Sequence, residues 1–240
     1  MTASLKEQER FYDRYWAERP TALNPAEVER LGEIYAAVAL ALRHSGRKSF
    51  SICDFGCGTG WLSAELSKFG RVKGVELSPE GAAIARQRYP QASFEAANIL
   101  TWRPAERFDL VVSSEVIEHI EDKAAFIVTV DAILKPGGYL ILTTPNQRVR
   151  RWWDATNSGE QILEYWMTPS ELRRLLPRGY AILHHRTFLF DYFYAGIFRV
   201  LSAPKLLGSL RAIGLLPLYD GLRDAAKLGL YQILVARKPG

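Results

Sequence analysis

The chain has 240 residues, 48% of them hydrophobic, which is enough for the core of one α/β domain with or without an added cap. Its 31 basic and 26 acidic residues leave a net charge of +5, so composition favours an ordinary solvated surface over one that binds nucleic acid. No run of about 18 apolar residues occurs, and residues 1–19 are charged and polar, so neither a membrane span nor a signal peptide is expected.

The first 45 residues predict two helices separated by a break over 20–25. The first helix, over 5–19, interleaves its charges with four large rings: Phe11, Tyr12, Tyr15 and Trp16. Such rings must be covered, so this helix either packs on the domain or forms a lid over a ligand. The second helix runs to about Leu42 and carries one apolar stripe, which predicts a packed face.

A glycine-rich turn over 54–60, Asp-Phe-Gly-Cys-Gly-Thr-Gly, separates an apolar strand over 50–55 from a helix that begins near Trp61. Glycines at alternate positions leave the turn without side chains, so a ligand can lie against bare backbone. Amide groups of the turn and the helix start offer hydrogen-bond donors to an anionic or polar group. Asp54 ends the strand, which is where an open α/β sheet places its ligand contacts.

The two cysteines of the chain, Cys53 and Cys57, lie four residues apart around this turn. Their directions disfavour a disulfide, and a metal site would need more partners. A reducing compartment, the cytoplasm, is therefore the expected location.

The next strand, over 71–77, carries Glu76 at its C-terminal end, where an acidic side chain accepts two hydrogen bonds from a ribose diol. Residues 50–77 therefore predict a nucleoside-binding βαβ unit. The dinucleotide fingerprint needs Gly or Ala where Trp61 stands. A bulky Trp opposes the close helix–strand packing of a dinucleotide site, so a different nucleoside is indicated.

The pattern continues with further helices and strands: a helix over 78–89, strands over 92–97 and 108–113, a helix that continues from there to 134, and a strand over 139–144. A long polar loop follows over 147–166, then a capped helix from Thr168 and strands over 179–190 and 229–238. Between these last strands, residues 191–228 predict two or three short helices. They form either a cap that completes the substrate pocket or an amphipathic surface that touches a membrane or a lipid-linked substrate.

The motif D-x-G-x-G-x-G followed by an acidic second strand resembles the class I S-adenosylmethionine (SAM)-dependent methyltransferases, and Leu-Lys-Pro-Gly-Gly over 134–138 is similar to the same family. The resemblance is good over roughly residues 50–145. It implies an α/β fold: a Rossmann-like seven-stranded sheet, mostly parallel with an antiparallel edge strand, and helices on both faces. The implied single domain has these parts: an N-terminal helical lid (1–45), a SAM-binding core (46–145), an acceptor loop, helix and strand (146–190), a helical cap insert (191–228) and a last strand (229–240).

The resemblance implies S-adenosyl-L-methionine as the cofactor and S-adenosyl-L-homocysteine as its product. The implied cofactor residues are Asp54, Gly56, Cys57, Gly58 and Gly60 at the methionine end and backbone cradle, Glu76 and Leu77 at the ribose, Asn98 and Ile99 at the adenine, and Ser114 at the methionyl amine. Related enzymes often carry Asp where Asn98 stands, and Asn keeps a carbonyl acceptor for the adenine amino group.

Methyl transfer requires donor and acceptor to be held in line, and a hydroxyl acceptor must also lose its proton. On the predicted helix start, the spacing of Glu115, Glu118 and His119 places all three on one face. We expect His119 and Glu115 to be catalytic. The segment Glu-Val-Ile-Glu-His also resembles two metal-using branches of the superfamily, one acting on quinone precursors and one on small RNAs. We expect no metal, the alternative being Mg²⁺, Mn²⁺ or Zn²⁺ held by Glu115, Glu118 and His119.

Four aromatic residues are candidate walls of the acceptor site: Tyr15, Trp152, Tyr165 and Trp166. Aromatic walls suit a ring-shaped acceptor. The general resemblance is to the quinone-biosynthesis and the sugar or natural-product O-methyltransferases, and it implies a methyltransferase acting on an oxygen of a small molecule, such as a sugar, a quinone precursor or a natural product. One alternative is an RNA methyltransferase, which a basic groove with stacking rings would favour. The other is a non-catalytic SAM-fold partner subunit, which a sealed acceptor pocket would favour. The sequence leaves the oligomeric state open.

Overall fold

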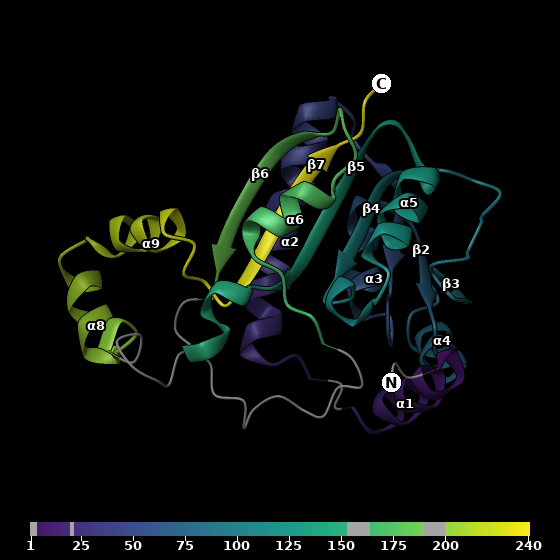
Figure 1. Ribbon diagram of the computed structural model, residues 1–240, viewed down its shortest axis with the longest axis horizontal. Coiled ribbons are helices and arrows are strands. Elements are labelled where there is room, and N and C mark those ends of the chain that lie inside the picture. Colours follow the sequence, from purple (N-terminus) through teal and green to yellow (C-terminus); the bar gives the residue numbers. More distant parts are fainter. Residues whose placement is uncertain (1–3, 20–21, 153–163, 190–199) are drawn as a thin grey trace.

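The computed structural model describes residues 4–19, 22–152, 164–189 and 200–240, and it has helices on both faces of a seven-stranded sheet (Figure 1). The strand order is β3-β2-β1-β4-β5-β7-β6. The strands are β1 (Phe50–Phe55), β2 (Gly70–Glu76), β3 (Ser93–Ala96), β4 (Phe108–Ser114), β5 (Leu134–Pro145), β6 (Ala181–Phe188) and β7 (Tyr231–Arg237).

The last strand in sequence, β7, runs antiparallel to both of its neighbours, β5 and β6. The strands from β3 to β5 pair in parallel. The mostly parallel sheet and the antiparallel pairing of the last two strands are therefore confirmed, with β7 one position inside the edge and β6 at the edge itself.

The helices surround this sheet. They are α1 (Leu5–Glu18), α2 (Pro25–Ser45), α3 (Trp61–Leu66), α4 (Pro79–Arg88), α5 (Lys123–Ile133), α6 (Pro169–Leu175), α8 (Pro204–Ala212) and α9 (Leu216–Ala225), with 3-10 helices η1 (Ser67–Phe69), η2 (Ile117–His119) and η3 (Gln147–Trp152). Among the described helices, none combines the length and apolar character that crossing a membrane requires.

The core divides into two parts because successive strand residues point to opposite faces. Leu110 and Val112 of β4 pack in a cluster with residues of α2 and α3. Val111, between them, packs with Phe126 of α5 on the other face. The continuous apolar run of β4 is thus explained by burial on both sides of a parallel strand.

Residues 115–119 do not form the helix start that the sequence predicts. Glu115 adopts a φ of +57°, and its N–H donates to the Thr143 carbonyl at 3.1 Å. This bond continues the pairing of β4 with β5 by one residue at the carboxyl end of β4. The 3-10 helix η2 follows, and α5 begins only at Lys123, where Asp122 is the N-cap. The prediction of one continuous helix was wrong because a long-range hydrogen bond to β5 outweighs the local helical spacing.

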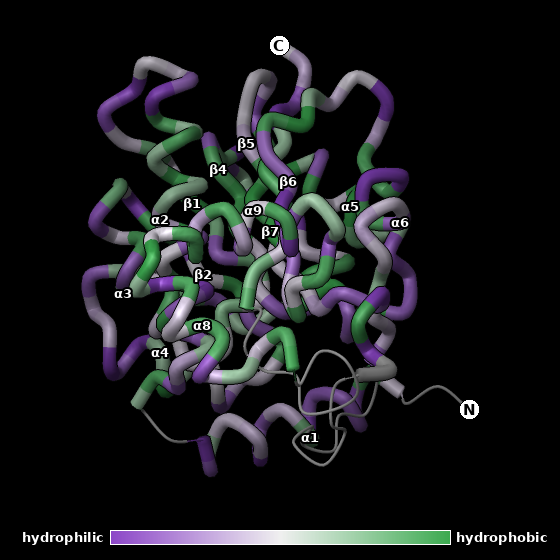
Figure 2. Tube along the Cα trace, turned by 90° about the vertical axis from the view of Figure 1, so that its left-hand side faces the viewer, coloured by the Kyte–Doolittle hydropathy of each residue, from purple (hydrophilic) through white to green (hydrophobic). Residues whose placement is uncertain are grey.

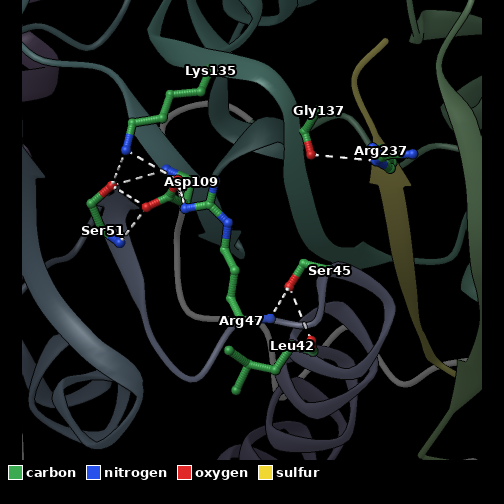
Figure 3. A network of polar contacts seen from close by, with 8 residues as sticks. All are labelled: Leu42, Ser45, Arg47, Ser51, Asp109, Lys135, Gly137 and Arg237. Atoms are coloured by element: carbon green, nitrogen blue, oxygen red, sulfur yellow. Dashed lines mark hydrogen bonds and ion pairs between the residues drawn. The ribbon is translucent and has the colours of Figure 1, made fainter. Parts of the chain in front are cut away.

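At the amino ends of the parallel strands, Asp109 connects three segments of the chain (Figure 3). Its carboxylate accepts hydrogen bonds from the Arg47 side chain at 2.8 Å and from Lys135 at 3.0 Å. It also accepts from the backbone N–H and the hydroxyl of Ser51, at 2.8 and 2.7 Å. These contacts fix β1, β4 and the start of β5 at the end of the sheet opposite their carboxyl ends.

Candidate active site

A cavity of about 600 Å³ lies at the carboxyl ends of β1, β2 and β4, with α1 along one side. The rings of Tyr12, Tyr15 and Trp16 on α1 line it. The aromatic N-terminal helix therefore covers the ligand end of the sheet, as a lid or a packed helix would.

The glycine turn after β1 forms part of the cavity wall. Gly56, Cys57 and Gly58 line it, and both glycines have positive φ, at +88° and +53°. A Cβ on Gly58 would lie 2.7 Å from the Trp16 ring, so a side chain there would clash with the ring that covers the turn. Gly60 does not line the cavity; a Cβ there would meet Phe94 at 2.9 Å, so this glycine allows close packing behind the turn.

Glu76 at the tip of β2 lines the cavity and is 5% exposed. Its carboxylate accepts hydrogen bonds from the Gly58 N–H at 2.9 Å, the Ser78 N–H at 3.1 Å and the Trp16 indole N–H at 3.4 Å. Burial raises the pKa of this carboxyl, against the lowering effect of those donors. The group expected to hold a ribose diol is thus in place and holds an indole N–H of α1, while Leu77 lines the cavity beside it.

Asp54 forms the floor of the cavity at 1% exposure, and the Ser63 hydroxyl donates to it at 2.6 Å. Burial raises its pKa to about 7, with a further contribution from nearby Glu76 and an opposing one from Ser63. Asn98 and Ile99, which follow β3, line the cavity next to these groups. The Asn98 side-chain carbonyl also accepts from the Leu100 N–H at 3.0 Å.

Ser114, Glu115, Glu118 and His119 lie together beyond the tip of β4 and line the same cavity. Glu115 accepts a hydrogen bond from the Thr143 hydroxyl at 2.9 Å, and Glu118 accepts one from Thr144 at 3.0 Å. Oε1 of Glu118 lies 3.9 Å from Nε2 of the His119 ring. The turn through Glu115 therefore gathers the residues that the sequence expects on one helical face.

Both carboxyls in this group have raised pKa values. Burial, reinforced by the nearby Glu118, raises the pKa of Glu115 to about 8, although Arg30 and Thr143 oppose the shift. Burial raises the pKa of Glu118 to about 7 against the hydrogen bond from Thr144. Two carboxyls whose pKa values lie near neutral pH, at one end of a cavity, can take up or release a proton there. Among the described residues, no group of three or more His, Cys, Asp and Glu side chains is arranged to hold a metal ion.

Arg30 of α2 is a cavity residue that the sequence analysis missed. It is 8% exposed, and one guanidinium nitrogen lies 3.8 Å from Glu115 while the guanidinium lies over the Tyr231 ring at 5.7 Å. Its Nε finds no hydrogen-bond partner among the described residues. A signal was present, because Arg30 precedes Ile34 and Val38 by four and eight residues and so shares their buried face.

The aromatic residues predicted as acceptor walls divide between cavity and surface. Tyr15 and Trp166 line the cavity, together with Tyr12, whose ring lies 6.3 Å from that of His119. Tyr165 is 52% exposed, does not line the cavity and lies under the Lys123 ammonium at 5.1 Å, so its role as an acceptor wall stays a prediction. The Trp152 side chain lies outside the described residues.

The expected helical cap is tested only in part. Within the described residues 200–228, no side chain lines the cavity, and α8 and α9 lie to one side of the sheet (Figure 1). Residues 190–199 of the same insert lie outside the described residues.

These residues fit an adenosyl sulfonium with an amino-acid tail. The turn offers bare backbone, Glu76 offers acceptors for a diol, and Ile99 offers an apolar wall. The buried guanidinium of Arg30 has a donor to which no described residue offers an acceptor, as expected where a ligand carboxylate binds.

Two curated relatives are similar in sequence. The ubiquinone biosynthesis O-methyltransferase of Methylobacterium sp. (strain 4-46) is 31% identical over 175 residues, covering 61% of this chain and 69% of that protein. The one of Bradyrhizobium sp. (strain ORS 278) is 31% identical over 138 residues, covering 51% of this chain and 54% of that protein. The chain thus matches from about half to about two thirds of the length of these relatives.

Two solved structures share the fold. The N-methyltransferase NodS from Bradyrhizobium japonicum WM9, in complex with S-adenosyl-L-homocysteine, has a TM-score of 0.63 at 19% identity, covering 97% of this chain and 99% of that chain. The cyclase SpnF has a TM-score of 0.64 at 19% identity, covering 99% and 98%. At these identities the likeness concerns the fold and leaves the acceptor open.

A family model described as a methyltransferase domain matches residues 11–185, which run from α1 into β6. That range includes the strands β1 to β5 and most of the residues around the cavity. The cofactor of this family is S-adenosylmethionine, and the chain belongs to the class I SAM-dependent methyltransferases.

Proposed function

We propose that this methyltransferase acts on a hydroxyl oxygen of a small ring-shaped acceptor, such as a quinone precursor, a sugar or a natural product. The observation that carries the proposal is the group of Glu115, Glu118 and His119 in the same cavity as the cofactor residues. The name of the relatives, ubiquinone biosynthesis O-methyltransferase, supports an oxygen acceptor and a quinone-type ring.

S-adenosylmethionine, when bound, supplies an electrophilic methyl group on a sulfonium. We assign its contacts as follows: Asp54, Gly56, Cys57 and Gly58 at the methionine end, Arg30 at its carboxylate, Ser114 at its amine, Glu76 and Leu77 at the ribose, and Asn98 and Ile99 at the adenine. Gly60 keeps the turn close to its neighbours and has no direct role in this assignment. The acidic side chains around the cavity outnumber the basic ones, which favours a positively charged ligand.

His119 is the proposed proton acceptor, and Glu115 the group that binds the acceptor hydroxyl. Glu118, with an oxygen 3.9 Å from the His119 ring, can stabilise the ring once it carries the proton. Tyr12, Tyr15 and Trp166 are the proposed walls for the acceptor ring, because they line the cavity on the α1 side and near β5.

The rival functions find less support. An RNA substrate needs a basic groove for its phosphates, whereas the cavity includes Glu27, Glu118 and Glu164 against two arginines, Arg19 and Arg30. A non-catalytic partner subunit would have a sealed acceptor side, whereas the volume of about 600 Å³ leaves room for an acceptor beside the donor. The cytoplasm remains the proposed location, supported by two buried free cysteines, Cys53 and Cys57.

The test is methyl transfer from S-adenosylmethionine to 1,2-dihydroxybenzene, a minimal quinone precursor, followed by mass spectrometry of the methyl ether. We expect His119→Ala to lower kcat by about 10²- to 10⁴-fold while the affinity for S-adenosylhomocysteine is unchanged. His184→Ala is the matched control, because His184 on β6 is exposed and does not line the cavity. Parallel losses of turnover and affinity in His119→Ala, or transfer to an amine acceptor alone, would contradict the proposal.

The same assay tests whether turnover requires a divalent metal ion. Turnover that EDTA abolishes and Mg²⁺ restores would support the alternative in which Glu115, Glu118 and His119 hold a divalent ion. Turnover unchanged by EDTA is the result we expect.

A further inference from the structure

Helix α9 turns its polar side toward the protein. Asp224 accepts hydrogen bonds from the backbone N–H and the hydroxyl of Thr187 on β6, at 2.6 and 3.2 Å. The Tyr219 hydroxyl donates to the Leu201 carbonyl at 2.9 Å, and Arg223, buried at 7% exposure, lies over the Tyr219 ring at 4.6 Å. The residues that attach this helix to the domain are therefore charged or polar, the reverse of an ordinary amphipathic helix.

The apolar side of α9 and the turn before it face solvent. Leu218 and Leu222, one helical turn apart, are 62% and 61% exposed, and Ile213 is 66% exposed. Together with Val200, Leu215 and the basic residues Lys205 and Arg211, these residues make up what we call the α8–α9 surface. Half of the large apolar side chains that are exposed in the described chain belong to it. In Figure 2 this side of the molecule is turned toward the viewer, with α8 and α9 in the foreground.

The charge of the α8–α9 surface is positive. The two acids of the described insert are neutralised within α9 and the turn after it, because Asp220 pairs with Arg223 and Asp224 pairs with Lys227. Lys205 and Arg211 on α8 are exposed and form no ion pair with a described residue. α8 therefore carries two positive charges that no described residue pairs, and Arg211 is two residues before the exposed Ile213.

The insert returns to the sheet at the same edge as the cavity. Tyr231, at the start of β7, pairs with Pro145 at the end of β5, and both residues line the cavity. In Figure 1 α8 and α9 lie beside the edge at which β6 ends. A flat partner that binds this surface would therefore lie near the end of the sheet at which the cavity is found.

We propose that the α8–α9 surface binds an anionic lipid bilayer, with its aliphatic side chains among the acyl chains and Lys205 and Arg211 at the lipid phosphates. Apolar side chains beside unpaired basic residues match the chemistry of the headgroup boundary. A second copy of the chain is a poorer occupant, because a two-fold contact through this surface would bring like charges together. The proposal does not depend on which acceptor is methylated.

The test is flotation of the full chain with vesicles of phosphatidylcholine alone and of phosphatidylcholine mixed equally with phosphatidylglycerol. We expect binding to the anionic vesicles and weakening at high salt. Leu218→Asp/Leu222→Asp should lower that binding by about tenfold or more, since each leucine loses its apolar burial. Lys205→Gln/Arg211→Gln should lower it by about tenfold on anionic vesicles. Val128→Asp, at an equally exposed valine of α5, is the matched control and should bind as the parent does.

Unchanged affinity for S-adenosylhomocysteine establishes that each variant is folded. Equal binding to both vesicle types, or binding that neither double variant weakens, would overturn the proposal. So would the absence of vesicle binding together with a dimer, seen by light scattering, that dissociates in Leu218→Asp/Leu222→Asp, because the occupant would then be a second copy.

Discussion

Arg30 places a buried positive charge beside Glu115, at the end of the cavity where the amino-acid part of the donor is expected. A guanidinium with an unsatisfied nitrogen binds a carboxylate through charge-assisted hydrogen bonds, each stronger than a neutral one. This residue brings α2 to the cavity that the glycine turn also lines, although it precedes Gly56 by 26 residues.

Replacing Arg30 by Met should weaken the binding of S-adenosylhomocysteine by about 10- to 100-fold, the effect of losing one charged hydrogen-bonding partner. The affinity for 5′-methylthioadenosine, which lacks the amino-acid part, should be unchanged, and calorimetry measures both. Arg43→Met is the control, because Arg43 is exposed on the same helix. Equal losses for the two ligands would mean that Arg30 supports the fold of the cavity and does not bind the carboxylate.

Most of the residues that the sequence assigns to the cofactor line the cavity, and they could be singled out because their signals are local. The glycine turn, Glu76 at a strand tip and Asn98 after the next strand all follow from positions along single elements, and these three parts line one cavity. Gly60 and Tyr165 do not line the cavity, since which side of a turn or loop faces it depends on the neighbours that the turn or loop packs against. Arg30 was missed although its place on the buried face of α2 is a local signal, because an arginine on such a face is not by itself a sign of a cavity.

At the scale of elements, Trp16 of α1 contacts residues to which we assign the donor, Gly58 and Glu76. The Trp16 ring lies against Gly58, and its indole N–H donates to Glu76 at 3.4 Å. We predict that a ribose diol bound to Glu76 competes with that N–H for the carboxylate, and that α1 shifts when the donor binds. Closing a helix over a bound donor also excludes water from the reaction.

Trp16→Phe keeps a ring over the turn and removes the competing donor. We expect it to bind S-adenosylhomocysteine about two- to tenfold more tightly, because one neutral hydrogen bond is worth about 0.5–1.5 kcal/mol. Trp102→Phe is the control, since the Trp102 indole donates to Glu95 away from the cavity. Calorimetry that finds weaker binding in Trp16→Phe would show that the indole contacts the bound ligand.

Helix starts at Ser78 and Thr168 were predicted because capping is decided within a few residues: each side chain accepts from the backbone N–H three positions later. The segment from Glu115 to His119 was predicted as helical because its spacing is compatible with a helix. The hydrogen bond from the Glu115 N–H to the Thr143 carbonyl of β5 keeps this segment out of a helix. The local sequence could not predict it, because the partner is 28 residues away.

For the molecule as a whole, Asp109 holds the end of the sheet opposite the cavity. Burial alone would raise its pKa, but the hydrogen bonds from Ser51 and Lys135 outweigh this effect and lower the pKa below its ordinary value of 3.8. A group whose pKa is lower in the folded state contributes stability above its unfolded pKa and loses it as the pH falls through the folded value.

Asp109→Asn should therefore lower the free energy of unfolding at pH 7 by about 1–3 kcal/mol, since it removes a charged acceptor from Arg47 and Lys135. The difference from the parent should shrink in acid, below about pH 4, where the parent carboxylate takes up its proton. Urea unfolding at both pH values measures it. Asp131→Asn, at a more exposed ion pair with Lys238, should lose less. If the difference in the free energy of unfolding between the parent and Asp109→Asn stays constant in acid, the charge of Asp109 does not cause it.

Because β7 lies between β5 and β6, completion of the cavity depends on the order in which these strands are synthesised. Tyr231 starts this strand, stacks on the Arg30 guanidinium and pairs with Pro145, so the wall of the cavity includes a residue near the end of the chain. On a ribosome, β6 emerges long before the strand on which it docks. We therefore expect a nascent chain to complete this wall of the cavity, and to bind the donor, only after β7 has paired between β5 and β6.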